Sequence, residues 1–259
     1  MNRTEFERKL SSLPLGAFRY FDTIGSTNDE ALTWASQGAS DFSLVIADEQ
    51  TSGRGRMNRK WFTPPGSALA LSLILRPTTV ERAHPSRITG LLALSLAESL
   101  LQLGLSPKIK WPNDVLLNEQ KVAGILVESS WLGESLDAMI LGMGVNVLKA
   151  AVPPADQLLF PATSIETELG HPIERSGLLR EILAKVLNWR PKLGTGAFLK
   201  AWEGHLAFRG QQVRVEGGSE GPTKGEVLGL AADGSLRLQN EHGRSVTVHF
   251  GEVHLRPLA

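Results

Sequence analysis

Four cationic side chains and two glycines lie close together in one short stretch of the sequence. The stretch is Gly53-Arg54-Gly55-Arg56-Met57-Asn58-Arg59-Lys60-Trp61. No Asp or Glu occurs between Thr51 and Val80, so these cations have no neighbour in the sequence that neutralises them. Arginine binds phosphate through two parallel hydrogen bonds, and glycine allows backbone conformations that a Cβ atom forbids. The stretch predicts an anion-binding loop; the alternative interpretation is a solvated basic loop on the surface.

The loop differs from the common nucleotide-binding loops. It contains neither GxxxxGKS/T nor GxGxxG, the patterns typical of loops that bind nucleotide phosphates. We therefore expect its side chains to hold the phosphate. Trp61 stands beside the cations, where it is placed to stack on a nucleobase, while burial in the core is an equally simple interpretation of this indole.

A second polar group precedes the loop, at the predicted start of a helix. Ser26, Thr27 and Asn28 offer hydroxyl, amide and backbone donors in one place. Thr27 and Glu30 have the spacing of a capping box. The group is therefore interpreted either as a ligand-binding set or as simple helix capping.

Further polar residues follow predicted strands. Residues 108–114 indicate a strand that runs into a turn, and 115–117 are expected to pair with 121–128 in a hairpin. The predicted strand 138–147 contains two glycines, and glycine inside a strand often marks close approach of a ligand to the backbone. The residues that carry chemistry in these elements are Lys110, Trp111, Asn113, Asp114, Lys121, Gly142, Gly144 and Asn146.

The composition limits the chemistry that the chain can perform. Its 259 residues contain no cysteine and 27 each of Lys+Arg and Asp+Glu, so there is neither a thiolate nor an overall basic field for DNA or a membrane surface. The six histidines are isolated, and the sequence holds no GxSxG and no cluster with metal-ligand spacing. These observations favour a reaction in which two bound substrates react directly while the protein positions them and neutralises phosphate charge.

The N-terminal residues and the hydropathy predict a cytoplasmic protein. Residues 1–10 are charged and lack the apolar run of a signal peptide. The most apolar stretches, 68–75 and 88–101, are too short or too interrupted to cross a bilayer.

The expected elements define an α+β fold, with a mixed β-sheet flanked by helices. Short apolar runs predict buried strands at 43–47 and 67–75. Helical spacing of apolar residues predicts helices at 88–103 and 174–190. The polar groups described above then lie at the ends of strands.

The pattern of the sequence changes at Gly210. Short alternating segments follow, separated by Asp233-Gly234 and His242-Gly243, which is typical of antiparallel strands. We therefore expect a catalytic domain over residues 1–208 and a small β-barrel domain over residues 209–259.

Five ordered blocks of the sequence resemble the motifs of the biotin protein ligases, also called biotin–acetyl-CoA-carboxylase ligases. The resemblance extends over residues 26–146, and the family also has a small C-terminal domain, an SH3-like β-barrel. The blocks are Ser26-Thr27-Asn28, Gln50 with the loop Gly53–Trp61, Lys110-Trp111-Pro112-Asn113-Asp114, Lys121-Val122-Ala123-Gly124-Ile125-Leu126-Val127-Glu128, and Gly142-Met143-Gly144-Val145-Asn146.

The resemblance implies a reaction in two steps. Biotin and MgATP form biotinyl-5′-AMP and pyrophosphate, and a lysine of the biotin carboxyl carrier protein of acetyl-CoA carboxylase then attacks the mixed anhydride. No covalent enzyme intermediate is needed, which agrees with the missing nucleophile. The implied small molecules are biotin, ATP and Mg²⁺.

The resemblance also implies a role for individual residues. Arg54, Arg56 and Lys121 are the expected catalytic residues, which neutralise the carboxylate and the α-phosphate. The expected biotin-binding residues are Ser26, Thr27, Asn28, Gln50, Gly53, Arg54, Arg56, Lys121, Gly124 and Leu126. The expected ATP-binding residues are Arg54, Arg56, Arg59, Trp61, Asn113 and Asn146. No direct metal motif is present, and Asp114 is the candidate for orienting Mg²⁺ or the incoming lysine.

Two departures from the family pattern bear on function. Met57 and Asn58 stand where the family usually has basic or small residues. The first motif begins at Ser26, which leaves no room for the helix-turn-helix domain of many bacterial members, so we expect a ligase without a DNA-binding function. A homodimer remains open as an alternative to a monomer.

Two other functions are alternatives to biotin ligation. A lipoate or octanoate ligase or transferase belongs to the same superfamily, but the polar set of Ser26, Thr27, Asn28 and Gln50 favours a ureido ring over an acyl chain. The other alternative is a nucleotide- or RNA-binding module in which the arginine loop contacts phosphates. It predicts that Lys121→Ala leaves binding intact.

Overall fold

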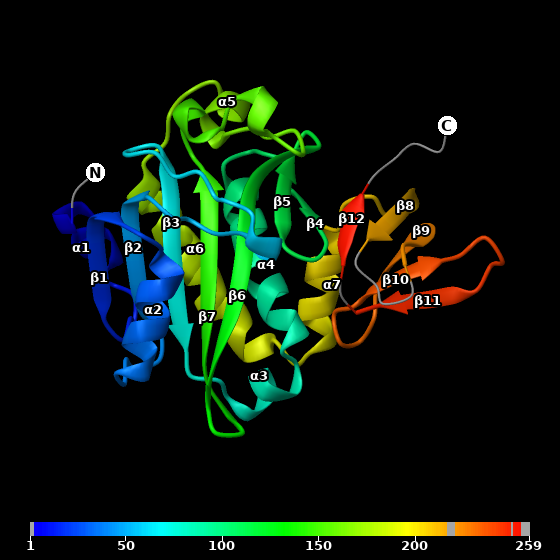
Figure 1. The fold of residues 1–259 in the computed structure, drawn as a ribbon, viewed down its shortest axis with the longest axis horizontal. Coiled ribbons are helices and arrows are strands. Elements are labelled where there is room, and N and C mark those ends of the chain that lie inside the picture. Colours follow the sequence, from blue (N-terminus) through cyan, green and yellow to red (C-terminus); the bar gives the residue numbers. More distant parts are fainter. Residues whose placement is uncertain (1–2, 217–220, 250, 255–259) are drawn as a thin grey trace.

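The computed structural model describes residues 3–216, 221–249 and 251–254 (Figure 1). A mixed sheet has the strand order β1-β2-β3-β7-β6-β5-β4, in which β1 and β2 are parallel and the other neighbours are antiparallel. Its strands are β1 (Phe18–Ile24), β2 (Ser43–Gln50), β3 (Ala68–Leu75), β4 (Lys108–Lys110), β5 (Asp114–Leu117), β6 (Gln120–Leu132) and β7 (Ser135–Asn146).

Helices cover this sheet, so the expected α+β class is confirmed. Within the described residues, no helix combines the length and the apolar character needed to cross a membrane. The helices are α1 (Arg3–Leu10), α2 (Thr27–Ser36), α3 (Thr79–Ala83), α4 (Ser86–Gln102), α5 (Ile165–Leu169), α6 (Arg175–Trp189) and α7 (Gly196–Gly204), with 3-10 turns at Arg56–Asn58, Lys149–Ala151, Ala155–Gln157 and Arg190–Lys192.

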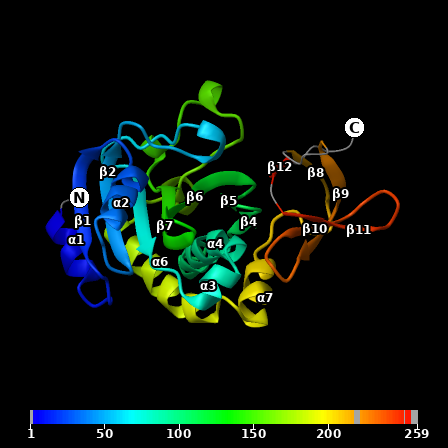
Figure 2. The same ribbon diagram turned by 60° about the horizontal axis from the view of Figure 1, so that its bottom comes forward.

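The two faces of the sheet are covered differently. Side chains alternate between faces along a strand, so Leu44 and Ile46 of β2 enter the main core while Val45 points to the opposite face. The main core contains the apolar sides of α4 and α6, and α2 lies on the other face (Figures 1 and 2). The sheet is therefore buried on both sides at β2, β3 and part of β7.

The face beneath α2 leaves one end of the sheet for the site. Ile140 of β7 packs under α2 with Ala31 and Ala35. Further along the same face, β7 presents Gly142 and Gly144, which have no side chains to fill the space. The helix begins beside these glycines, and the Gly53–Trp61 loop runs above them. The glycines of β7 thus lie at the bottom of the site, the start of α2 lies at its side, and the loop lies over it.

A smaller sheet follows α7, with the order β11-β10-β9-β8-β12. It is antiparallel, as expected, but β11 and β12 are its two open edges, so it does not close into the predicted barrel within the described residues. Residues 217–220, 250 and 255–259 of the predicted domain lie outside the described part, and the boundary at 208/209 stays a prediction. The strands are β8 (Gln212–Glu216), β9 (Thr223–Leu230), β10 (Leu236–Gln239), β11 (Ser245–Val248) and β12 (Glu252–His254).

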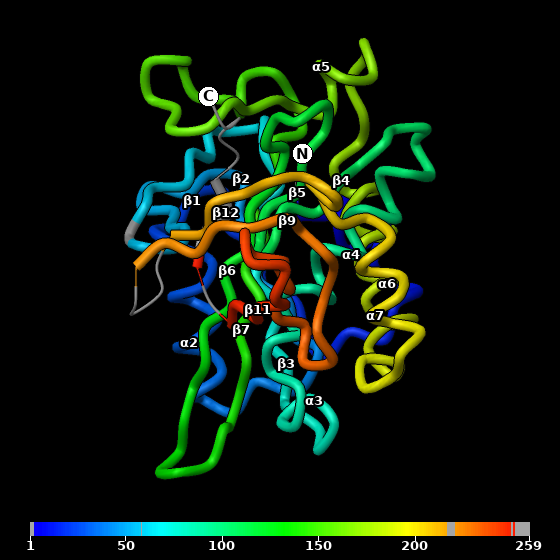
Figure 3. Tube along the Cα trace, turned by 90° about the vertical axis from the view of Figure 1, so that its right-hand side faces the viewer, coloured from blue at the N-terminus to red at the C-terminus, as the bar shows by residue number. Residues whose placement is uncertain are grey.

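The smaller sheet is joined to the larger domain by buried polar contacts. Arg87 of α4 donates to the carbonyl oxygen of Ala232 at 3.1 Å from Nε and to that of Leu193 at 2.6 Å. The Trp111 indole donates to the carbonyl of Gly234 at 3.1 Å. The turn around residue 233 is therefore attached both to α4 and to the Lys110–Asp114 stretch of the site. Figure 3 shows the strands of the smaller sheet, in orange and red, in front of the larger sheet.

The predicted capping box at Thr27 and Glu30 is wrong. Ser26 is the N-cap of α2, its side chain makes no capping bond, and the Thr27 hydroxyl bonds Gln50 instead. A complete capping box occurs at Thr78 and Glu81, where it starts the unpredicted helix α3. The spacing of the two residues is the same in both places, and tertiary contacts decide which pair caps a helix.

Candidate active site

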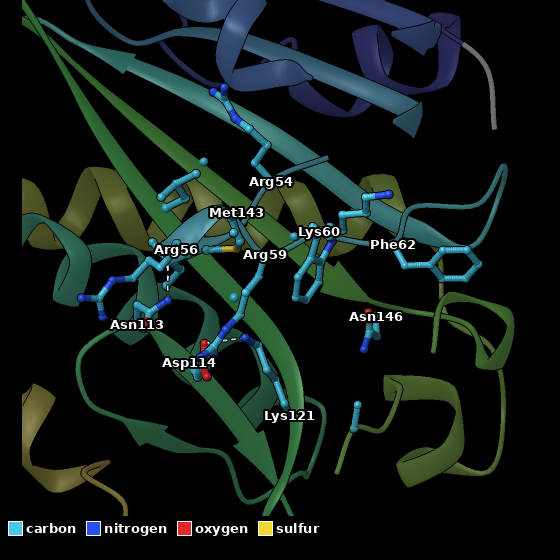
Figure 4. A pocket seen from close by; sticks show the side chains of 18 of the residues that line it. Arg54, Arg56, Arg59, Lys60, Phe62, Asn113, Asp114, Lys121, Met143 and Asn146 are labelled. Carbon is cyan, nitrogen blue, oxygen red and sulfur yellow. Dashed lines mark hydrogen bonds and ion pairs between the residues drawn. The ribbon is translucent and has the colours of Figure 1, made fainter. Parts of the chain in front are cut away.

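One cavity of about 420 Å³ brings the predicted polar groups together (Figure 4). Its walls come from the start of α2, the end of β2, the arginine loop and strands β5, β6 and β7, together with residues 151–162. Of the predicted site residues, Gly53 alone does not line it. Those that do are Ser26, Thr27, Asn28, Gln50, Arg54, Arg56, Arg59, Trp61, Asn113, Asp114, Lys121, Gly124, Leu126 and Asn146.

Thr27 and Gln50 form the first part of a polar wall. The backbone N–H and the hydroxyl of Thr27 both reach Gln50 Oε1, at 2.9 and 3.1 Å. Gln50 Nε2 donates to the Thr63 hydroxyl at 3.2 Å, which fixes the orientation of the amide. One Nε2 hydrogen has no bond in this set, so Gln50 is able to donate to a ligand carbonyl.

Asn28 forms the second part of this wall. Its Oδ1 lies 2.6 Å from the Ser72 hydroxyl, and its Nδ2 donates to Glu128 Oε2 at 2.6 Å. A Cβ atom at Gly142 would lie 2.2 Å from Asn28 Oδ1. The glycine in β7 is therefore needed for a side chain of the protein, which corrects the expectation that it marks the approach of a ligand.

The arginine loop is a closed turn held by its own backbone. Trp61 N donates to the Gly53 carbonyl at 2.8 Å, and Gly55 N donates to that of Arg59 at 2.7 Å. The expectation that both glycines supply special backbone angles is wrong. A Cβ at Gly53 would lie 2.5 Å from Trp61 O, so Gly53 is required by lack of space, whereas the left-handed residue is Met57, with φ 56°.

Arg54 has carboxylate partners that the local sequence does not reveal. Its Nη2 lies 2.6 Å from Asp29 Oδ1 and 3.2 and 3.3 Å from the two Glu128 oxygens. Figure 4 shows this side chain directed away from Arg56 and Lys121. The expectation that the loop cations lack a neutralising partner is therefore wrong for Arg54, because Asp29 and Glu128 lie outside the acid-free stretch.

Arg56 connects the loop to two other parts of the molecule. Its Nη1 lies 3.3 Å from Asn113 Oδ1 and 3.1 Å from the carbonyl oxygen of Gly251 in the smaller domain. Asn113 in turn donates from Nδ2 to the Ile125 carbonyl at 3.0 Å. Arg59 extends from the same loop toward Asp114 and Lys121 (Figure 4). The C-terminal domain thus contacts the arginine loop through the Gly251 carbonyl.

Lys121 is positioned by both its backbone and its charge. The predicted hairpin is found, but Gln120 already belongs to β6, so its turn has two residues, Asn118 and Glu119, both with positive φ. The Lys121 N–H donates to the Pro161 carbonyl and its carbonyl accepts from Thr163 N, which anchors the strand. Its Nζ forms an ion pair of 2.7 Å with Asp114.

The carboxylate of Asp114 is engaged by two lysines. Lys121 Nζ lies 2.7 Å away and Lys110 Nζ lies 3.9 Å away, and Asp114 is nearly buried. No group of three or more metal-ligating side chains occurs in the part of the chain that the structure describes. These residues do not form a magnesium cage, and the expected metal contact at Asp114 does not fit a carboxylate already neutralised by lysine.

Trp61 lies on the floor of the cavity between two glycines. A Cβ at Gly144 would lie 2.1 Å from its Nε1, and one at Gly124 would lie 3.1 Å from its ring. The buried Nε1 has no hydrogen-bond partner among the described residues, and Lys121 Nζ lies 5.4 Å from the ring centre. Gly144 therefore accommodates this indole, in the same way that Gly142 accommodates Asn28.

Several lining residues were not identified from the sequence. Residues 151–162 belong to no element predicted from the sequence, yet Phe160 lines the cavity with Lys110 Nζ 4.4 Å from its ring centre. Asn146 Nδ2 donates to the Thr163 carbonyl at 3.1 Å. Glu128, the last residue of a quoted block, was given no role. An apolar Leu158-Leu159-Phe160 run beside prolines was the one available signal for the first of these.

Known proteins match both parts of the chain. Residues 20–146 match the family described as Biotin/lipoate A/B protein ligase, and residues 208–256 match the Biotin protein ligase C terminal domain. The biotin–[acetyl-CoA-carboxylase] ligase of Paracoccus denitrificans is 37% identical over 85% of this chain and 93% of its own length. The ligase of that name from Mycobacterium tuberculosis is 33% identical over 96% of each chain.

A solved structure agrees with these matches. The biotin protein ligase from Aquifex aeolicus in complex with biotin and ATP has a TM-score of 0.79 and 28% identity, and it covers 93% of this chain and 98% of its own. The fold and the cavity define a ligase of the biotin and lipoate type. The chain belongs to the biotin protein ligase family.

Proposed function

We propose that this protein activates biotin with ATP and transfers it to a lysine of an acceptor protein. The biotin carboxylate attacks the α-phosphorus of ATP, pyrophosphate leaves with the bridging oxygen, and biotinyl-5′-AMP forms. The acceptor amine then attacks the acyl carbon, loses a proton and displaces AMP. The observation that carries the proposal is a single cavity with a neutral hydrogen-bonding wall at one side and cations at the other.

The neutral wall is proposed to bind the ureido ring. Gln50 offers an N–H for the ureido carbonyl, and Asn28 Oδ1 accepts from a ureido N–H. Ser26 and Thr27 complete this wall, and Gly124 and Leu126 bring the β6 backbone alongside the fused rings. A wall built for these bonds disfavours lipoate, which would leave buried polar groups unpaired.

The cations are proposed to stabilise the charge that builds during adenylation. Arg56, Arg59 and Lys121 face the cavity and carry fixed positive charge to the carboxylate and the α-phosphate. Arg54 joins them after exchanging its pairs with Asp29 and Glu128 for the substrate anion. Both pairs are partly solvent-exposed, so the exchange costs little.

ATP is proposed to lie along the arginine loop. Trp61 stacks on the adenine, and Asn113 and Asn146 contribute amide groups near it. Magnesium enters as the complex with ATP, held mainly by phosphate oxygens and water, which is how this ion commonly binds to proteins. Asp114 is assigned to holding Lys121 in place, since its carboxylate contacts that ammonium directly.

The proposed acceptor is the biotin carboxyl carrier domain of acetyl-CoA carboxylase. The names of the relatives from Paracoccus denitrificans and Mycobacterium tuberculosis support this choice. We place the reaction in the cytoplasm, where ATP is available. A homodimer is also proposed, and sedimentation at several protein concentrations tests it.

Pyrophosphate release tests the proposed function. The protein is incubated with MgATP and either biotin or lipoate, and a carrier domain is then added. We expect release only with biotin, followed by a mass gain of one biotinyl group on the carrier lysine. Release with lipoate alone would contradict the assignment, and an unchanged carrier mass would contradict the second step.

A further inference from the structure

Glu128 contacts two of the proposed site residues without lining the cavity itself. Gly124, Leu126 and Glu128 alternate along β6 and so share the face of the sheet that carries the cavity. The Glu128 carboxylate accepts from Asn28 Nδ2 at 2.6 Å and from Arg54 Nη2 at 3.2 Å. Its partners are one residue of the proposed ureido wall and one of the proposed catalytic cations.

The contacts around Asn28 leave its amide in one orientation. A carboxylate has no hydrogen to donate, so the group that faces Glu128 is the Nδ2. The remaining Nδ2 hydrogen is directed to the carbonyl of Leu126, 3.4 Å away. One lone pair of Asn28 Oδ1 accepts a hydrogen bond from the Ser72 hydroxyl, and Ser72 is fully buried. Both amide hydrogens are thus engaged within the protein.

Asn28 then offers a ligand nothing but the second lone pair of Oδ1. An amide that is free to rotate could meet either a donor or an acceptor, but a fixed acceptor selects an N–H and leaves an ether oxygen unpaired. A buried oxygen without a hydrogen-bond donor is not compensated for its lost contact with water, which lowers the affinity for the wrong ligand.

We infer that Glu128 is a positioning residue for substrate specificity: it fixes the Asn28 amide as a hydrogen-bond acceptor and so selects a ligand with a ureido N–H. This inference rests on the proposed function, because it assumes that the Asn28 wall meets the ureido ring. It assigns a role to a residue that touches neither substrate.

The ligands that test the inference are biotin and its two cyclic carbamate analogues, in which one or the other ureido N–H is replaced by oxygen. For the wild-type protein, we expect one analogue to bind about 100-fold more weakly than biotin. Glu128→Gln has the same shape and can donate to Asn28 Oδ1, so the amide is free to turn. We expect this variant to raise the KM for biotin about tenfold, to leave the KM for ATP within about twofold, and to lower discrimination against that analogue.

Asp29→Asn distinguishes an effect of Glu128 through Asn28 from an effect through Arg54. It removes the negative charge that lies 2.6 Å from Arg54 Nη2 and leaves Asn28 untouched. If Glu128 acts through Asn28, this control keeps the wild-type discrimination between biotin and the carbamate. If Asp29→Asn reproduces the Glu128→Gln result, the effect passes through Arg54 and the inference is overturned.

A swap of polarity provides a second test. Asn28→Asp alone sets two carboxylates side by side, and we expect a loss of about 100-fold or more in biotin binding. The double variant N28D/E128Q restores one donor and one acceptor across the same contact without changing the total charge. We expect it to regain at least about tenfold over N28D, and no recovery would overturn the inference.

Ser72→Ala tests the orientation of the Asn28 amide even if the Glu128→Gln variant does not fold. It removes the bond to Asn28 Oδ1 and leaves the carboxylate in place. We expect a smaller loss of discrimination, about threefold to tenfold, and unchanged discrimination would count against the inference. Wild-type protein that releases no pyrophosphate with biotin would refute the proposed function, whereas active wild type with an unaffected Glu128→Gln variant would refute the inference alone.

Discussion

Two arginine clusters in this molecule have nearly the same distances and different surroundings. Arg190 lies 2.6 Å from both Glu81 and Asp41, and Arg54 lies 2.6 Å from Asp29. The Arg190 side chain is 14% exposed and that of Glu81 1%, whereas those of Arg54 and Asp29 are 38% and 54% exposed. Arg54 lines the cavity and Arg190 does not.

The difference shows what each cluster is suited to do. Burial alone would lower the pKa of Arg190, but the hydrogen bonds that it donates to Glu81 and Asp41 outweigh burial and raise this pKa above its usual range. Removing one member leaves another charge buried without a partner. The pairs of Arg54 are exposed and contribute little to stability, which fits the proposal that Arg54 exchanges them for a substrate anion. Distance alone does not separate a structural ion pair from a functional one.

The largest predicted effect concerns stability. Arg190→Ala leaves the buried Glu81 carboxylate uncompensated, so the free energy of unfolding measured in urea is expected to fall by about 3–5 kcal/mol. The control Arg180→Ala breaks an exposed pair with Glu181 and is expected to cost less than about 1 kcal/mol. At 25 °C the folded fraction of Arg190→Ala should form adenylate normally. A loss of kcat without a loss of stability would assign Arg190 to the site.

The corresponding removal of a cation from the proposed site is Lys121→Ala. It removes a cation that faces the cavity, and the rate of adenylate formation in a rapid-quench experiment is expected to fall about 100- to 1000-fold. The control Arg82→Ala alters a residue that donates to the Leu136 carbonyl away from the cavity, and its rate should change little. Equal losses of rate in the two variants would contradict the assignment of Lys121 to the catalytic site.

A methyl group at Gly142 tests the polar wall. The new Cβ would lie 2.2 Å from Asn28 Oδ1, so Gly142→Ala displaces Asn28 and is expected to raise the KM for biotin about 10- to 100-fold. The helix-start control Gly196→Ala meets open space and should leave this KM unchanged. A normal KM for biotin in Gly142→Ala would show that Asn28 does not contact the substrate.

The smallest expected effect concerns Trp61. If the indole stacks on adenine, Trp61→Ala raises the KM for ATP about tenfold at saturating biotin, whereas Trp61→Phe keeps an aromatic face and raises it less than threefold. Equal effects of the two substitutions would indicate that Trp61 fills space on the glycine floor and does not stack.

The sequence predicts the parts of this structure that depend on local pattern. The helices at 88–103 and 174–190 are found as α4 and α6 with bounds shifted by a few residues, because apolar periodicity reports burial directly. The hairpin that pairs 115–117 with 121–128 is found as β5 and β6, because a short polar segment between two apolar runs is itself a local signal. The blocks that resemble a family contain the lining of the cavity except for Phe62, Leu71 and the 151–162 segment.

The sequence does not reveal contacts between distant residues. Arg54 meets Glu128 across 74 positions and Ser72 meets Asn28 across 44, and no local rule links such pairs. For the same reason the sequence predicts a capping box at Thr27, although the Thr27 hydroxyl donates to Gln50 Oε1 in the structure. The glycines of β7 were attributed to a ligand because the side chains above them are also distant in the chain.

The most direct test is a crystal structure with a non-hydrolysable analogue of biotinyl-5′-AMP. The account predicts that the ureido ring lies within about 3.2 Å of Asn28 Oδ1 and Gln50 Nε2. Arg56 and Lys121 should bind the phosphate substitute, and Arg54 should have left Asp29. A ureido ring bound elsewhere, with Arg54 still paired to Asp29, would contradict it.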